Sequence, residues 1–313
     1  MSMDIEKNFV SVVAYMRDDE PMVVPFLKTV AGWLMRRFES FEIVLVDDGS
    51  IDRSVDVALR FGKDLGNSIL TVLRMGYKQG KESSLCAGMD LSIGDFVFEF
   101  ESIEPNCTEE ILEKVYAASL GGNDIVAATP SGPAPISNRA FFRLFNQGLA
   151  SKDPIRSERF RCISRRAINR IGMVSGKVVY RKAVYYNCGL KTVAIPFDLL
   201  PFERSTGRDR EEEWGLAIDS LIYFTNLGFR ISVALSIAMM GFSLCGLFYA
   251  IAARLILGHV VEGWLTTMLF LSFAFFGVFT ILAIMVKYLS LILESTHRRQ
   301  PYLFESIQKA NEN

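Results

Sequence analysis

Two glutamates interrupt a segment that otherwise has the composition of a buried strand. In the stretch 96–101 (FVFEFE), successive side chains of an extended chain point to opposite faces. The three phenylalanines therefore share one face, while Glu99 and Glu101 share the other, about 7 Å apart. Two carboxylates this close need compensating positive charge, which either a divalent cation or neighbouring arginines supply.

A second acidic pair, Asp47-Asp48, follows the apolar run that ends at Val46. Ordinary turn chemistry is one explanation, because Gly49 turns the chain freely and Ser50 is suited to cap a following helix. The other explanation is a ligand site, since the two acidic pairs each end a predicted strand. In sheets of parallel strands, ligands bind beyond the carboxyl ends of the strands.

A crevice lined by carboxylates repels a phosphorylated ligand unless a divalent cation lies between them. Mg²⁺ and Mn²⁺ are commonly held by one or two carboxylates together with substrate phosphates. The sequence therefore predicts Mg²⁺ or Mn²⁺ at Glu99 and Glu101. The alternative is that both glutamates pair with arginines of the chain.

Basic side chains cluster further along the sequence and are suited to bind phosphate groups. A phosphate monoester is already anionic near neutral pH, with a second pKa of about 6, so as an acceptor it needs no general base. The alternative for this cluster is a solvated basic face near anionic lipid headgroups. Its members are Arg156, Arg159, Arg161, Arg165, Arg166, Lys177, Arg181 and Lys182.

Short apolar runs alternate with amphipathic stretches through the first half of the chain, which predicts an α/β fold with a mostly parallel sheet and helices on both faces. The expected strands are 9–15, 41–46, 68–74, 96–100 and 124–128. The expected helices are 21–38, 52–63, 82–92 and 109–119.

Two long uncharged runs, 231–253 and 264–286, account for the high mean hydropathy of +0.25 in this chain of 313 residues. A helix of about 23 residues spans a hydrocarbon core of about 30 Å, so the runs predict a transmembrane hairpin. Two buried core helices are the alternative. The preceding stretch 211–227 has an apolar face at helical spacing and is expected to lie along the membrane or, alternatively, in the core.

Charges around these runs predict which side of the membrane the rest of the chain occupies. The N-terminus has no apolar signal-peptide core, and Arg230, Lys287, Arg298 and Arg299 flank the hairpin. We therefore expect both chain ends on the cytoplasmic side of a bacterial-type inner membrane. The net charge of −1 gives no reason to expect a nucleic-acid partner.

Several segments together resemble the membrane-anchored family-2 glycosyltransferases that act on polyprenyl phosphates, similar to dolichol-phosphate and undecaprenyl-phosphate glycosyltransferases. The resemblance covers nearly the whole chain, although Glu99-Phe100-Glu101 stands where the family has Asp-x-Asp, and Arg159 stands where it has an aspartate. The matching segments are Val10 to Glu20, Asp47 to Ser50, Gly80-Lys81, Phe160 to Arg166, Arg204 to Gly207, and the hairpin followed by Glu294, Arg298 and Pro301-Tyr302.

The resemblance implies an inverting transfer of a sugar from a UDP- or GDP-linked donor to a membrane polyprenyl phosphate. It implies that the catalytic residues are Glu101, Arg161 and Arg165, with a metal at Glu99 and Glu101. The residues implied to bind the nucleotide sugar are Tyr15, Arg17, Asp19, Asp47, Asp48, Glu99, Phe100 and Arg204. The alternative, prompted by the substituted motifs, is a non-catalytic membrane scaffold that keeps the fold.

The fold that the resemblance implies is of the GT-A type, carried on the predicted hairpin. We expect a cytosolic catalytic domain at 1–200, a juxtamembrane amphipathic segment at 201–229, a transmembrane hairpin at 230–290 and a cytosolic tail at 291–313. Residues 306–313 are polar and are expected to fray. A homo-oligomer is plausible by resemblance.

Overall fold

The computed structural model describes residues 5–65, 68–132, 158–174, 181–200, 263–296 and 302–310, together with scattered residues between 234 and 245. The chain divides into two compact units, described here one at a time. The first unit consists of Met1–Ala217 and Arg299–Asn313, and the second of Ile218–Arg298.

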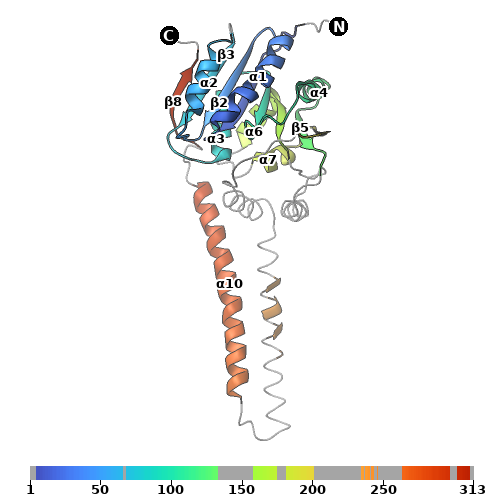
Figure 1. Ribbon diagram of the computed structural model, residues 1–313. Helices are drawn as coiled ribbons and strands as arrows, with labels where there is room; N and C mark the ends of the chain where they lie inside the picture. Colours follow the sequence, from blue (N-terminus) through green and yellow to red (C-terminus); the bar gives the residue numbers. More distant parts are fainter. Residues whose placement is uncertain are drawn as a thin grey trace. The chain divides into compact units, whose positions relative to one another are not determined.

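The first unit is built on a sheet whose described strands run in the order β7-β5-β6-β4-β1-β2-β3-β8 (Figure 1). The neighbours β4, β1, β2 and β3 are all parallel, whereas β6 and β8 run antiparallel to their partners. The strands are β1 (Val10–Met16), β2 (Phe41–Asp47), β3 (Ile69–Met75), β4 (Phe96–Phe100), β5 (Ile125–Pro130), β6 (Phe160–Ser164), β7 (Thr192–Phe197) and β8 (Phe304–Lys309).

Helices connect the parallel strands and cover both faces of the sheet. The expected α/β fold is confirmed, as are the five strands and four helices predicted in the first half of the chain. Strands β1 and β2 are buried along their whole length, which explains their nearly continuous apolar sequences. The helices of this unit are α1 (Glu20–Arg37), α2 (Ser54–Gly62), α3 (Lys81–Leu91), α4 (Glu109–Leu120), α6 (Arg165–Val174) and α7 (Arg181–Asn187).

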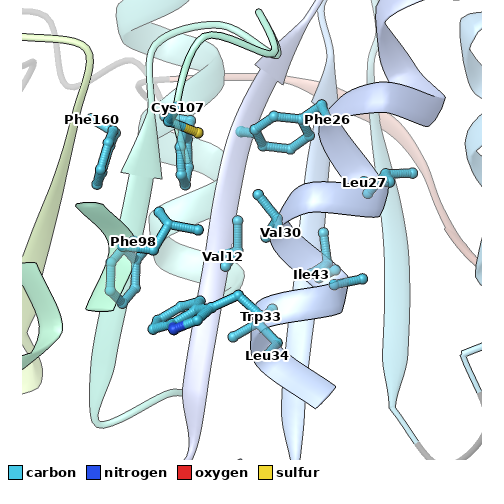
Figure 2. Close-up of a cluster of buried hydrophobic side chains, with 14 of the residues drawn as sticks. Val12, Phe26, Leu27, Val30, Trp33, Leu34, Ile43, Phe98, Cys107 and Phe160 are labelled. Carbon is cyan, nitrogen blue, oxygen red and sulfur yellow. The ribbon is translucent and has the colours of Figure 1, made fainter. Parts of the chain in front are cut away.

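One face of the sheet carries an aromatic cluster beneath α1 and α4. Figure 2 shows Phe26, Val30 and Trp33 of α1 directed at Val12 and Phe98 of the sheet. The rings of Trp33 and Phe98 meet edge to face with centroids 5.1 Å apart. Residues at helical spacing on α1 thus bury one continuous stripe, which positions the start of this helix above the end of β1.

The other face is covered by α3, α6 and α7. Helix α3 approaches β1 and β2 closely at Gly88, where an added Cβ would lie 2.5 Å from Val13 Cγ1 and 2.6 Å from Val46 Cγ2. Glycine is needed here because no side chain fits between this helix and the sheet. The close packing fixes the start of α3 near the ends of both strands.

Strand β8 was not foreseen. The prediction that 306–313 frays is wrong for the described residues, because Phe304–Lys309 pairs antiparallel with β3 at the edge of the sheet, where Figure 1 shows β8 in red. The Ala310 amide also donates to the Leu70 carbonyl at 2.9 Å. Backbone hydrogen bonds hold this edge strand, so its polar composition gave no signal of it.

In the second unit, the later apolar run forms α10 (Trp264–Thr296). Phe242, from the earlier run, stacks on Phe270 with ring centroids 5.4 Å apart. No helix among the described residues has the length and apolar character that a membrane crossing requires. Most of 231–253 and the expected segment 211–227 lie outside the described residues.

Candidate active site

The two predicted acidic pairs lie at the same edge of the sheet. Strands β1, β2 and β4 are parallel neighbours, so their carboxyl ends at Met16, Asp47 and Phe100 gather there. Ligands in open α/β sheets bind outside these strand ends. The segments that leave β1, β2 and β4 therefore form the candidate site.

The segment after β1 is tied to the segment after β2 by hydrogen bonds. The amide of Asp18 donates to Ser50 Oγ at 2.9 Å, and the amide of Ile51 donates to Asp18 Oδ1 at 2.8 Å. Asp18 has a positive φ of 49°, which is unusual outside glycine. Of the predicted residues in this segment, Asp19 accepts the amide of Arg17 at 3.1 Å, so both belong to the same ordered turn.

Asp48 joins the segment after β2 to the one after β3. Its Oδ1 accepts the amide of Gln79 at 2.7 Å, and its Oδ2 accepts the amide of Gly80 at 3.0 Å. The hydroxyl of Tyr15 also donates to Oδ2, at 3.1 Å. Asp48 is fully buried, and these three donors stabilise its negative charge.

Asp47 is buried beside Asp48 but has fewer partners. Its Oδ1 accepts the amide of Ser50 at 3.1 Å, and its Oδ2 lies 3.6 Å from Arg74 Nε. Burial raises the pKa of the Asp47 carboxyl, since the hydrogen bond to Ser50 and the charge of Arg74 offset it only in part. The turn explanation holds for Gly49, which turns the chain with a φ of 77°, but Ser50 does not cap the next helix, which begins at Ser54. Both aspartates lie at the ligand edge.

Glu99 lies inside the protein on the face covered by α7. Its side chain is fully buried, and its Oε1 accepts Arg181 Nη2 at 3.0 Å. Its Oε2 accepts the hydroxyl of Tyr185 at 2.8 Å. Arg161 Nη1 lies 3.6 Å from Oε1, directly across the β4–β6 pair.

Glu101, two residues further, lies at the outer end of the same face. Its Oε1 accepts both Arg161 Nη2 and Lys182 Nζ, each at 2.7 Å, and 22% of its side chain is exposed. Burial opposes the charged form, but Lys182, Arg161 and Lys81 outweigh it and lower the pKa of Glu101 to about 2. Glu101 is therefore a carboxylate at any pH near neutrality.

Arg161 links the glutamates and is itself 1% exposed. Besides Glu99 and Glu101 it contacts Glu158, whose Oε2 lies 3.1 Å from Arg161 Nε. Its guanidinium also lies over the ring of Tyr185, 4.9 Å from the centroid. Although burial opposes its charge, the three glutamates raise the pKa of Arg161. Arg161 thus positions carboxylates, and its own charge is already compensated within the protein.

Comparison with known proteins places this geometry in a family. The model for Glycosyl transferase family 2 matches residues 9–172, which include every strand of the candidate site. The chain belongs to glycosyl transferase family 2. The resemblance inferred from the sequence is thereby confirmed.

Relatives of this family 2 chain match it over almost its whole length. The undecaprenyl-phosphate 4-deoxy-4-formamido-L-arabinose transferase of Edwardsiella ictaluri is 26% identical over 325 residues, covering 97% of this chain and 95% of the relative. The prophage bactoprenol glucosyl transferase homolog of Escherichia coli is 22% identical over 311 residues, covering 96% and 99%.

Among solved structures, a mannosyltransferase from Pyrobaculum calidifontis in complex with GDP-Man and Mn²⁺ superimposes with a TM-score of 0.52. It shares 13% sequence identity, and the alignment covers 90% of each chain. At this identity the likeness concerns the fold, which supports the GT-A-like architecture expected from the sequence.

The Glu-x-Glu motif of this family 2 chain does not fit a pair of metal ligands. Both oxygens of Glu99 are bonded inside the protein, so a metal would have to displace Arg181 Nη2 or the Tyr185 hydroxyl from this buried carboxylate. Within the described residues, no group of three or more His, Cys, Asp or Glu side chains is placed to share a metal ion. The metal predicted at Glu99 and Glu101 is therefore at odds with the bonds that these side chains already make.

Two other predicted site residues, Arg165 and Phe100, do not face Glu101. Arg165 is at the opposite end of the β4–β6 pair, where it donates to the carbonyls of Gly94 and Ser92 at 2.9 Å each. Phe100 points into the aromatic face and stacks on Phe160 with centroids 4.7 Å apart. Arg204 is outside the described residues.

Three residues of the site had not been assigned a role by sequence reasoning. Tyr185 and Glu158 complete the buried network around Arg161, and no local sequence pattern predicts this role for them. Lys81 begins α3, lies 5.8 Å from the ring centroid of Tyr15 and lowers the pKa of Glu101. Lys81 directly follows Gly80 in a segment that resembles the family, and this position could have indicated a role in the site.

Proposed function

We propose that the protein transfers a sugar from a nucleotide-sugar donor, UDP- or GDP-linked, to a membrane polyprenyl phosphate, with inversion at the anomeric carbon. The observation that carries this proposal is the near full-length match to relatives named as undecaprenyl-phosphate and bactoprenol transferases. The mannosyltransferase of the same fold was solved with the nucleotide sugar GDP-Man, which supports a donor of this class.

The site suggests how the donor is arranged. The turn at Asp18 and Asp48 is ordered by hydrogen bonds and holds the nucleoside next to Tyr15. The diphosphate then extends toward the end of β4, where Lys81 and Lys182 lie near Glu101. Fixed positive charge at that point stabilises the departing diphosphate without reorganisation during the reaction.

The acceptor needs little activation. Its phosphate monoester is anionic near neutral pH, with a second pKa of about 6, so no general base is required. A phosphate oxygen attacks the anomeric carbon, forming the new C–O bond as the bond to the donor diphosphate breaks, and the nucleoside diphosphate leaves with the electron pair. Loss of the family's aspartate at Arg159 is compatible with this acceptor.

Membrane placement is part of the proposal and rests on the sequence. The uncharged runs 231–253 and 264–286 form the hairpin, with the catalytic unit and both chain ends on the cytoplasmic side. A reporter enzyme fused after Asn313 should be active only in the cytoplasm. Activity confined to the periplasm would overturn this orientation. A homo-oligomer stays a prediction.

Incubation of membranes containing the protein with a panel of labelled nucleotide sugars tests the reaction. Label should pass from one donor into the extracted lipid. The matched control is Asp48→Ala, which removes the acceptor of the Gln79 and Gly80 amides and should abolish the lipid label. An absence of lipid label from every donor would favour the non-catalytic scaffold.

A further inference from the structure

We infer that Lys182, bound to Glu101, and Lys81, at the start of α3, supply the positive charge for the diphosphate of the donor, so that this protein binds its nucleotide without a divalent ion. The inference rests on the proposed function, because it concerns the same donor site. Two lysine side chains would then neutralise the diphosphate, a role that the sequence analysis predicted for Mg²⁺ or Mn²⁺.

Exposure of the side chains differs along the network of ion pairs around Arg161. Glu99 and Arg161 are sealed inside the protein, with side chains 0% and 1% exposed. Glu101 and Lys182 lie at the outer end, with side chains 22% and 11% exposed. A ligand at the strand ends therefore reaches the Glu101–Lys182 pair and not the inner glutamate.

The two glutamates that a metal would need are already paired within the protein. Glu99 accepts Arg181 and the hydroxyl of Tyr185, and Glu101 accepts Arg161 and Lys182. Pairing with cations of the chain is the alternative weighed for these glutamates from the sequence.

Lys182 is held in place by Glu101. The 2.7 Å contact with Glu101 Oε1 fixes its ammonium group, while Arg161 binds the same oxygen from the interior. A divalent ion on this oxygen would have to displace one of these cations, and like charges at such short range repel. Glu101 Oε1 is therefore already bonded to two cations of the chain.

The test is nucleotide binding by the purified full chain, measured by calorimetry with UDP and with GDP, in excess EDTA and in Mn²⁺. One nucleotide should bind in EDTA with a Kd within about twofold of that in Mn²⁺. Binding that appears only with Mn²⁺ would overturn this inference while leaving the proposed function intact. Binding of neither nucleotide under either condition would overturn both.

Variants separate the charge of Lys182 from its contribution to folding. Lys182→Gln should weaken nucleotide binding in EDTA about tenfold or more, whereas Lys182→Arg keeps the charge and should retain binding. Lys191→Gln, at an exposed lysine outside the network, is the control and should bind as the unmodified protein does. Equal affinity in Lys182→Gln, with an unchanged melting temperature, would overturn the role of Lys182.

Discussion

Two acidic pairs end strands β2 and β4, which lie on either side of β1 in one sheet, yet their charges are compensated in different ways. At the end of β2, Asp48 accepts backbone amides of the segment after β3, along with the hydroxyl of Tyr15. At the end of β4, Glu99 and Glu101 accept the cationic side chains of β6 and α7.

The difference shows that acidic side chains at the same edge of the sheet serve two purposes. Backbone amides order the segments that surround a ligand, and they do so with neutral dipoles. Side-chain cations instead add full charges, which a buried network must balance among its own members. The first pair therefore shapes the site, and the second sets its electrostatics.

The largest expected effect is that of Glu99→Gln. The change leaves the buried Arg181 and Arg161 with one carboxylate fewer, so the free energy of unfolding should fall by about 3 kcal/mol. Chemical denaturation of the purified protein measures this. The control is Glu110→Gln, at an exposed ion pair with Lys114, where the denaturation midpoint should not move. A Glu99→Gln variant as stable as this control would show that the network does not stabilise the fold.

A smaller loss is expected at the other pair. Asp48→Asn keeps one acceptor oxygen but turns an amide NH₂ toward the donors of Gly80 or Gln79, so stability should fall by about 2 kcal/mol. Tyr15→Phe removes a single hydrogen bond and should cost about 1 kcal/mol. If Asp48→Asn cost as much as Glu99→Gln, the contrast between dipoles and full charges would not hold.

Acidification should affect the two pairs with opposite sign. The pKa of Glu101 falls from 4.5 to about 2, so its contribution to stability is complete above pH 4.5 and is lost as the pH falls toward 2. Burial raises the pKa of Asp47 above 3.8, so its contribution is complete below pH 3.8 and is lost as the pH rises through the higher value.

Stability measured between pH 2 and pH 5 checks both signs in single variants. In Glu101→Gln, the free energy of unfolding should fall less as the pH is lowered, because the variant lacks a group that stabilises the fold only when ionised. Asp47→Asn should make stability rise more steeply with pH, because it removes a contribution that declines over the same range. If the free energy of unfolding of the two variants depended on pH in the same way, the opposite pKa shifts assigned to Glu101 and Asp47 would be wrong.

The smallest effect on the donor site is expected at Arg165. This residue matches the sequence signature of the family, but it binds backbone carbonyls at the far end of β4. Arg165→Met should lower stability by about 1 kcal/mol and leave the affinity for nucleotide unchanged. A folded Arg165→Met variant that no longer binds nucleotide would restore the role predicted from the sequence.

Local pattern was sufficient for much of the fold. Alternating apolar runs and amphipathic stretches predicted β1 to β5 and α1 to α4, because each of these elements buries a face that its own residues define. The alternation in 96–101 likewise placed the phenylalanines on one face and the glutamates on the other, as the structure shows. Motif order along the chain identified the family, which is confirmed.

Only the tertiary structure decided what the glutamates contact and which strands close the sheet. Arg161, Arg181 and Lys182 lie 60 or more residues from Glu99 and Glu101 along the chain, so a local sequence pattern cannot relate them. β8 pairs with β3 across more than 200 residues through backbone groups that every residue shares. Sequence fixes which side chains carry charge, whereas the partner of each charge depends on long-range packing, because electrostatic energy follows distance in space and not separation along the chain.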